Sequence, residues 1–223
     1  SNAAVCDALS LAATANGIPE GAIGRLRDTD RAAAAEMMKL NGLIDVLIPR
    51  GGQGLIQSVL QQATIPVIET GVGVCHVYID ESGDLDMAAD IIENAKCSRP
   101  SVCNAAETLL VHESVAAACL PEIAKRLAAR GVELRCDARA KALMPGSIDA
   151  TEEDWSTEYN DLILSIKVVD SLDEAINHIE TYGTHHSDAI VTACYDTAER
   201  FLNEVNSAAV YVNASTRFTD GEE

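Results

Sequence analysis

The alternation of short apolar runs with helix-like segments is the feature that most limits how this chain can fold. Amphipathic or alanine-rich stretches of helical periodicity separate runs with strand character along most of its length. Strands separated by helices join into parallel sheets through crossover connections. The sequence therefore predicts an α/β fold, with parallel or mixed sheets and helices on both sheet faces. We expect strands over residues 44–48, 66–69, 75–80, 107–111, 132–136, 162–169, 188–193 and 208–212, and a short one over residues 21–26.

Helical patterns fill most of the intervals between these runs. The stripe of apolar residues over residues 85–96 is a good example of the 3.6-residue period. Residues 142–155 are acidic and interrupted by Pro and Gly, so we expect a surface connection there. Helices are predicted over residues 4–15, 30–40, 54–62, 85–96, 114–130, 172–182 and 196–205.

The charge and hydropathy of the chain limit the classes of partner that it can bind. Of its 223 residues, 16 are Lys or Arg and 35 are Asp or Glu, for a net charge of −19. Such a chain repels nucleic-acid phosphates and anionic membranes, and 4% aromatic residues leave little for base stacking. No apolar run approaches the ~20 residues of a membrane span, and we expect no signal peptide. We expect a cytoplasmic protein that acts on a small molecule and binds neither nucleic acid nor membrane.

The cysteines and histidines do not form a metal-binding pattern. Seven cysteines without a C-x-x-C pair argue against a zinc ribbon, a thioredoxin-type motif and a secreted disulfide framework. The five histidines have no metal-type spacing with neighbouring carboxylates or thiols. The sequence therefore predicts no metal and a reducing compartment.

Cys103 is the candidate nucleophile. It lies in a polar turn after Pro100, between a helix-like and a strand-like segment. A thiol in a turn can reach a substrate, and the positive charge of Arg99 favours its thiolate form. The alternative, a loop cysteine without a role, stays equally open on the local sequence alone.

Three other segments place candidate binding residues at strand ends. The turn at residues 49–54 (PRGGQG) precedes a helix, so free N–H groups and Arg50 would suit an anion, although glycines also serve such turns for steric reasons alone. Glu69 could be a general base or a solvated carboxylate. Arg217 could bind a carboxylate or phosphate, or be a surface arginine.

The glycines at 71 and 73 mark the expected domain boundary. Residues 1–3 (Ser-Asn-Ala) look like the remnant of an expression tag. The chain then starts inside a helical pattern and stops without a tidy terminus, so we expect a fragment of a longer protein.

Together these segments resemble one family, the γ-glutamyl phosphate reductases (glutamate-5-semialdehyde dehydrogenases) of the aldehyde dehydrogenase superfamily. The resemblance covers nearly the whole chain in order, and several of its motifs are long and specific. They are DVLIPRGG (45–52), IPVI (65–68), GVCH (73–76), NAK (94–96), RPSVCN (99–104), HSDAI (186–190), NEV (203–205) and AVYVNASTRFTDG (209–221).

The resemblance implies roles for individual residues. Cys103 matches the catalytic thiol, with Asn104 beside it in the catalytic set. Glu69 aligns with the general base of the superfamily, which an acyl phosphate reductase does not need, and is grouped with the cofactor-contacting residues. Glu158 aligns with the glutamate that contacts the nicotinamide ribose. The turn with Arg50, Gly51 and Gly52 would pass the cofactor pyrophosphate, and the substrate would meet Arg99, Asn213, Ser215 and Arg217.

The implied reaction is the NADPH-dependent reduction of L-glutamyl 5-phosphate to L-glutamate 5-semialdehyde and phosphate, a step of proline biosynthesis, through a Cys103 thioester. Residues 4–73 would be the C-terminal half of the dinucleotide-binding domain, residues 74–213 the catalytic domain and residues 214–223 the start of a truncated return segment. The full-length protein would be a homo-oligomer. The alternatives are another aldehyde dehydrogenase with Glu69 as base, or a non-catalytic α/β binding domain.

Overall fold

The computed structural model describes residues 2–68 and 71–219 and divides into two compact units between Thr70 and Gly71. The predicted glycine boundary at residues 71–73 lies directly at this division. That the first unit is half of a dinucleotide-binding domain, and the second the catalytic domain, stays a prediction.

The first unit is a small helical body with a thin core. It contains α1 (Asn2–Ala15), α2 (Arg31–Met37) and α3 (Gln53–Gln62). In the described residues, the strands predicted at residues 44–48 and 66–69 reduce to two isolated parallel bridges, Asn41 with Ile44 and Leu47 with Val67. Residue 69 lies outside the described residues. The Leu47 N–H donates to the Pro66 carbonyl at 2.9 Å. These strand predictions and the one at residues 21–26 are wrong here, because strands without further paired neighbours are only marginally stable.

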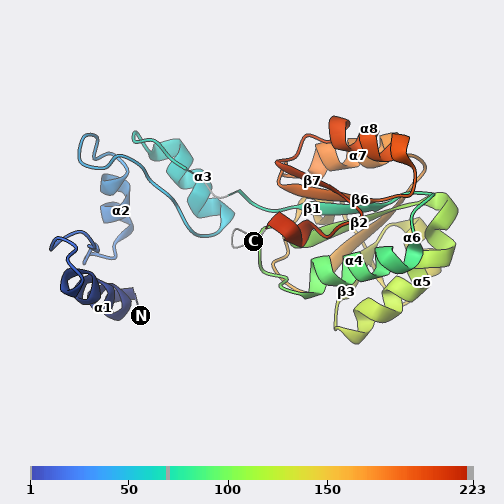
Figure 1. Cartoon of the computed structure of the whole chain (residues 1–223), viewed down its shortest axis with the longest axis horizontal. Helices are drawn as coiled ribbons and strands as arrows, with labels where there is room; N and C mark the ends of the chain where they lie inside the picture. Colours follow the sequence, from blue (N-terminus) through green and yellow to red (C-terminus); the bar gives the residue numbers. More distant parts are fainter. Residues whose placement is uncertain (1, 69–70, 220–223) are drawn as a thin grey trace. The chain divides into compact units, whose positions relative to one another are not determined.

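The second unit is built on one parallel sheet of seven strands, which confirms the predicted fold class (Figure 1). The strand order is β4-β3-β5-β2-β1-β6-β7, and every neighbouring pair runs parallel. The strands are β1 (Cys75–Ile79), β2 (Ala106–His112), β3 (Glu133–Cys136), β4 (Ile148–Asp149), β5 (Ile163–Val169), β6 (Ser187–Val191) and β7 (Ala209–Val212). The helices are α4 (Leu85–Cys97), α5 (Glu113–Ala129), α6 (Ala138–Leu143), α7 (Leu172–Tyr182) and α8 (Tyr195–Glu204), with 3₁₀ turns η1 (Glu152–Ser156) and η2 (Thr216–Thr219).

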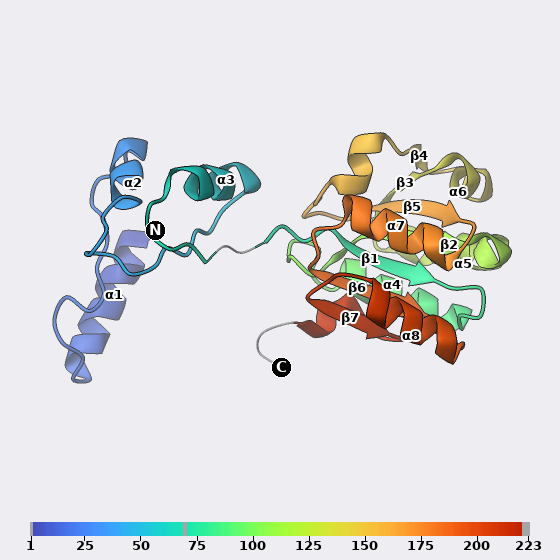
Figure 2. The same cartoon turned by 90° about the horizontal axis from the view of Figure 1, so that it is seen from above.

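Helices cover both faces of this sheet (Figures 1 and 2). α4, α5 and α6 pack on one face, in a large core that includes Ile92, Leu120 and Leu164. α7 and α8 cover the other face, where Tyr78 and Phe201 stack at a centroid distance of 6.5 Å. Strands covered on both faces are apolar along most of their length. Accordingly, every residue of β1 and β6 is buried.

Parallel strands place all their entry segments at one edge of the sheet, here called the amino edge. In Figure 2 the arrows of β1 and β5 point the same way, so the chain enters both strands at this edge. Residues 71–74 lead into β1, residues 98–105 into β2 and residues 157–162 into β5. Ligands of open α/β sheets usually bind at the carboxyl ends of the strands. A site built from these entry segments lies at the opposite edge.

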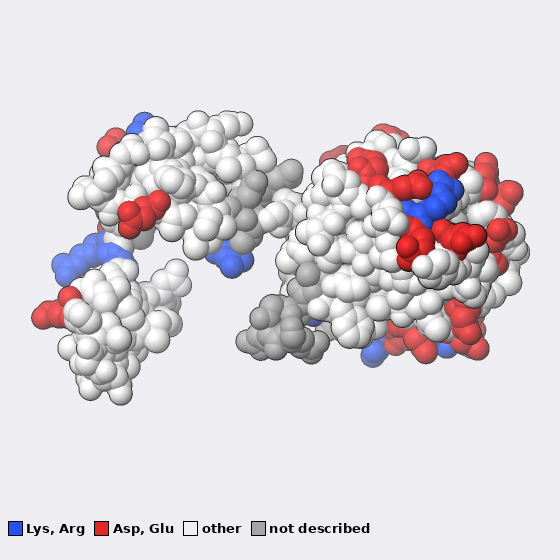
Figure 3. All heavy atoms as spheres, turned by 45° about the horizontal axis from the view of Figure 1, so that its top comes forward, with Lys and Arg blue, Asp and Glu red and all other residues white. Residues whose placement is uncertain are grey.

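Among the charged side chains visible on the second unit, acidic ones cover more of the surface than basic ones (Figure 3). Many basic side chains are paired with acids rather than presented as a basic surface. Arg126 contacts Asp90 at 2.5 Å, and Arg130 contacts Glu93 at 2.9 Å, which ties α5 to α4. Within the described residues, no helix has the length and apolar character to cross a membrane.

Candidate active site

Cys103 lies in the loop of residues 98–105 between α4 and β2, here called the Cys103 loop. The Ala105 N–H donates to the Val102 carbonyl at 3.0 Å, so the chain turns tightly around Cys103. Cys103 is exposed, whereas Asn104 directly after it is buried. The predicted turn is therefore present, and it leaves the thiol of Cys103 accessible to a small molecule.

Gly73 holds the backbone of Cys103 from the side of β1. A Cβ atom on Gly73 would lie 1.4 Å from the Cys103 carbonyl oxygen and 2.7 Å from its Cα, so only hydrogen fits there. The buried Cys75 thiol donates to the same Cys103 carbonyl at 3.3 Å. Gly73 and the first residue of β1 thus fix the backbone of the nucleophile, and neither local sequence reveals these contacts.

Glu158 reaches the same place from the segment before β5. Its Oε1 atom accepts a hydrogen bond from the Gly73 N–H at 2.9 Å. Gly73 therefore touches Cys103 and Glu158 at once. The structure brings together the predicted nucleophile and the residue predicted to contact the cofactor ribose.

The C-terminal segment holds the Cys103 loop from another side. The Thr216 hydroxyl donates to the Asn104 carbonyl at 2.7 Å. The Arg217 guanidinium donates to Asn104 Oδ1 and, through Nε at 3.2 Å, to the Ser98 hydroxyl. The backbone N–H of Arg217 donates to the Ser215 hydroxyl at 3.2 Å. Asn104, Ser215 and Arg217 are thus assembled at the loop, where their contacts orient the residue that follows the nucleophile.

A buried ion pair lies at the base of the Cys103 loop. Lys96 Nζ and Glu107 Oε2 are 2.6 Å apart, and both side chains are at most 1% exposed. Burial raises the pKa of Glu107 to about 7, although the neighbouring Lys96 cation lowers it. Burial also lowers the pKa of Lys96. Sequence reasoning did not single out this pair as a functional feature.

Comparison with known proteins gives matches along the whole chain. A γ-glutamyl phosphate reductase of Moorella thermoacetica is 59% identical over 223 residues, which are 100% of this chain and 53% of that protein. A crystal structure of the γ-glutamyl phosphate reductase of Thermotoga maritima superposes with a TM-score of 0.93 at 50% identity, over 99% of this chain and 53% of that one. None of the protein-family models compared with the chain matches it.

The chain is homologous to the γ-glutamyl phosphate reductases along its whole length. It spans about half the length of the curated reductases that it matches. An acetylating aldehyde dehydrogenase from Geobacillus thermoglucosidasius, 22% identical, superposes with a TM-score of 0.72 over 96% of this chain and 55% of that one. At that identity the likeness concerns the fold alone, and it confirms the predicted aldehyde dehydrogenase-like architecture.

The remaining residues that the reductase resemblance selected are Arg99, Asn213, Arg50, Gly51, Gly52 and Glu69. Asn213 follows β7 at the carboxyl edge of the sheet, where the strands end, opposite the amino edge. Its Oδ1 accepts a hydrogen bond there from the Thr192 N–H at 3.0 Å. Arg99 is an exposed member of the Cys103 loop. The turn residues Arg50, Gly51 and Gly52 belong to the first unit. Glu69 lies outside the described residues. The binding roles of all these residues stay predictions.

Thiol labelling tests whether Cys103 is accessible. We expect iodoacetamide near neutral pH to modify Cys103 and Cys194, the two exposed cysteines, at least about tenfold faster than Cys75 or Cys119. Hydrogen bonds from Thr197 lower the pKa of Cys194, whereas burial raises the pKa of Cys119 to about 11. Peptide mass mapping after short exposure measures the order. Reaction at Cys75 ahead of Cys103 would contradict the exposure seen here.

Proposed function

We propose that the protein containing this chain reduces L-glutamyl 5-phosphate to L-glutamate 5-semialdehyde, with NADPH as hydride donor, in proline biosynthesis. The observation that carries the proposal is the exposed Cys103, whose backbone is fixed by Gly73 while Glu158 binds the same glycine. Homology to the γ-glutamyl phosphate reductases supports the substrate. A cytoplasmic homo-oligomer is part of the same proposal.

The residues of the chain suit a nicotinamide dinucleotide. α3 begins directly after Gly52, and in the described residues no side chain caps its first turn, so its backbone N–H groups can bind an anion such as a pyrophosphate. Gly51 has a φ of +157°, and a Cβ there would lie 2.8 Å from Leu55 Cδ2. Glu158, beside Cys103, would bind the nicotinamide ribose. When bound, the cofactor supplies a hydride to the carbonyl carbon held on Cys103.

Cys103 would carry the covalent part of the reaction. Its thiolate attacks the γ-carbonyl carbon, a C–S bond forms, and the C–O bond to phosphate breaks as phosphate leaves. The backbone N–H of Cys103 stabilises the oxyanion that develops in this step. After hydride transfer, the C–S bond of the resulting thiohemiacetal breaks, which releases the aldehyde and returns the thiolate. Each step needs the Cys103 sulfur at a fixed distance from the carbonyl carbon, so the backbone contacts of Gly73 serve the chemistry directly.

The reverse reaction of the full-length protein tests this proposal. We expect glutamate 5-semialdehyde and NADP to yield NADPH only when phosphate is present. Cys103→Ala is expected to lower that rate by about 10³-fold or more, because the covalent route is lost. Cys194→Ala, at the other exposed cysteine, is the matched control and should retain the rate.

Independence from phosphate would overturn the proposal. Oxidation of the aldehyde to free acid without phosphate would favour an aldehyde dehydrogenase with Glu69 as base. Retained activity in Cys103→Ala would instead show that the nucleophile is assigned wrongly.

A further inference from the structure

We infer that the buried Lys96–Glu107 pair positions the Cys103 loop relative to Glu158, and so sets the distance between the covalent intermediate and the cofactor. The inference rests on the proposed function. Lys96 and Glu107 would be positioning residues, since neither is exposed to a substrate.

The first observation is the place of the pair in the chain. Lys96 is the next-to-last residue of α4, and Glu107 is the second residue of β2. The Cys103 loop is the segment between them. Their contact at 2.6 Å therefore closes the loop at its base, independently of the main-chain contacts at its tip. A loop held at both its base and its tip keeps the nucleophile in one place.

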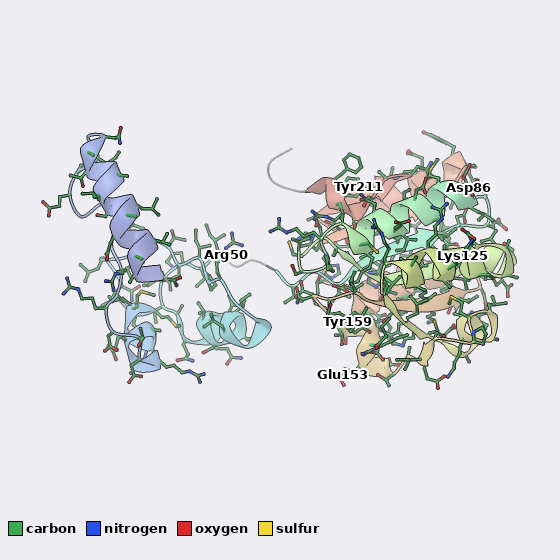
Figure 4. The ribbon with its side chains drawn as sticks, turned by 90° about the horizontal axis from the view of Figure 1, so that it is seen from below. Arg50, Asp86, Lys125, Glu153, Tyr159 and Tyr211 are labelled. Atoms are coloured by element: carbon green, nitrogen blue, oxygen red, sulfur yellow. The ribbon has the colours of Figure 1, made fainter. Side chains whose placement is uncertain are left out.

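The second observation is that the pair also touches the segment of Glu158. Lys96 Nζ lies 5.8 Å from the ring centroid of Tyr159, the residue after Glu158. Tyr159 is labelled in Figure 4. The Tyr159 hydroxyl is in turn held by Ser165 of β5 at 2.7 Å and by Asp154 of η1 at 2.8 Å. The backbone of Asn160, which adopts a positive φ of 55°, lies near the Glu107 carboxyl group and lowers its pKa, although burial raises that pKa more. One ion pair thus contacts the two segments that carry Cys103 and Glu158.

The third observation concerns energy. A fully buried ion pair seldom stabilises a fold more than apolar residues of the same volume, because desolvating both charges offsets their attraction. Among the described residues, Glu107 Oε1 has no hydrogen-bond partner, which adds to this cost. Stability alone therefore does not account for the pair. A charged contact does fix direction and distance more narrowly than an apolar one, and this is what a positioning element requires.

Several ionisable groups face the pair and enter its pH dependence. They come from α4, from β1 and from the segment before β5, and they are Cys97, Cys75, Glu158, Tyr159 and Asp161. Since the pKa of Glu107 is raised to about 7, its carboxylate gains a proton as the pH falls through 7. The ion pair is then lost below that pH and present above it. The position of Cys103 is expected to follow this change.

The test compares alkylation of Cys103 with alkylation of Cys194 in the same molecule, so that no enzymatic activity is needed. We expect Glu107→Gln to change the rate at Cys103 by about 5-fold or more, within the range of such couplings, and to leave Cys194 unchanged. In the wild type, the ratio of the alkylation rates at Cys103 and Cys194 should change stepwise near pH 7. This step should be absent in Glu107→Gln. In the full-length enzyme, kcat should fall by about 10–100-fold with little change in the KM for the acyl phosphate.

The double variant Lys96→Met/Glu107→Leu separates positioning from packing. It removes both charges and fills the space, so we expect it to fold stably and still to show the altered Cys103 rate and no step near pH 7. Recovery of the wild-type rate and pH profile in the double variant would overturn the inference, as would an unchanged profile in Glu107→Gln. If the reverse reaction proved independent of phosphate while Glu107→Gln altered the alkylation of Cys103, only the proposed reaction would be overturned, and the positioning role of the ion pair would stand.

Discussion

Gly73→Ala is expected to displace Cys103 and to lower the free energy of unfolding of the second unit by about 3 kcal/mol, the upper range for overpacking. The added Cβ would lie 1.4 Å from the Cys103 carbonyl oxygen and 2.3 Å from its carbonyl carbon. Both are backbone atoms, so no side-chain rotation relieves the clash. Either the segment before β1 or the Cys103 loop has to move. Movement of the segment before β1 would break the hydrogen bond from Gly73 to Glu158, whereas movement of the loop would displace Cys103 itself.

Urea unfolding followed by tryptophan fluorescence measures this effect. Trp155, the single tryptophan of the chain, is buried in the second unit and reports on that unit alone. Gly146→Ala is the matched control, because a Cβ there meets no atom within 4 Å, and its stability should stay within about 0.5 kcal/mol. A Gly73→Ala variant as stable and as reactive at Cys103 as the wild type would show that the contact is not as tight as described.

The elements of the second unit follow closely from local sequence. α7 is predicted at residues 172–182 and observed at Leu172–Tyr182, because its apolar stripe stops at Gly183. The predicted connection at residues 142–155 instead contains β4 and part of α6. A two-residue strand is too short to show a period. It exists because Ile148 and Asp149 pair with β3, a contact that local sequence does not encode.

The first unit shows the limit of pattern-based prediction. Residues 44–48 have strand character, yet of these only Ile44 and Leu47 pair, in isolated bridges to Asn41 and Val67. Large apolar side chains in this unit stay exposed, such as Leu43 at 80% and Leu11 at 75%. A strand forms only when partners complete its hydrogen bonds and cover its faces. Composition alone supplies neither the pairing strands nor the covering side chains.

The candidate site divides in the same way. The turn around Cys103 could be predicted because Pro100 and the polar residues of the loop act locally. The contact of Gly73 with the Cys103 backbone could not be predicted, since only the pairing of β1 with β2 brings the two segments together. The resemblance grouped Asn213 with Ser215 and Arg217. In the structure the Asn213 side chain donates to the Thr192 carbonyl, at the edge of the sheet where the strands end. The Arg217 guanidinium instead donates to Asn104 Oδ1, at the amino edge.

The sequence contains one signal for the buried pair, namely two charged residues within otherwise mostly apolar segments. Lys96 lies four residues after Ile92, on the apolar stripe of α4, and Glu107 lies two residues before the apolar run 109–111 of β2. A charge at such a position is seldom tolerated without a partner of opposite sign. Neither residue identifies its partner alone. The sheet does, by placing the start of β2 beside the end of α4.

Lys96→Met is therefore expected to lower the free energy of unfolding of the second unit by about 3–5 kcal/mol, the cost of leaving one member of a buried pair alone. The Glu107 side chain, at most 1% exposed, would have to stay ionised without its cation or take up a proton. Because its pKa is raised, proton uptake grows easier as the pH falls, so the loss in stability should be smaller at pH 5 than at pH 8. Urea unfolding at both pH values, read from Trp155 fluorescence, measures it.

Lys125→Met supplies the matched control for this substitution. Lys125 is 78% exposed on α5 and pairs with Glu122 at 3.5 Å, so its loss should cost at most about 1 kcal/mol at either pH (Figure 4). Addition of Glu107→Leu to Lys96→Met should recover most of the lost stability, since it removes the stranded carboxylate. If Lys96→Met were as stable as Lys125→Met, the Lys96 ammonium would not be paired in a buried site. The base of the Cys103 loop would then be held by apolar packing alone.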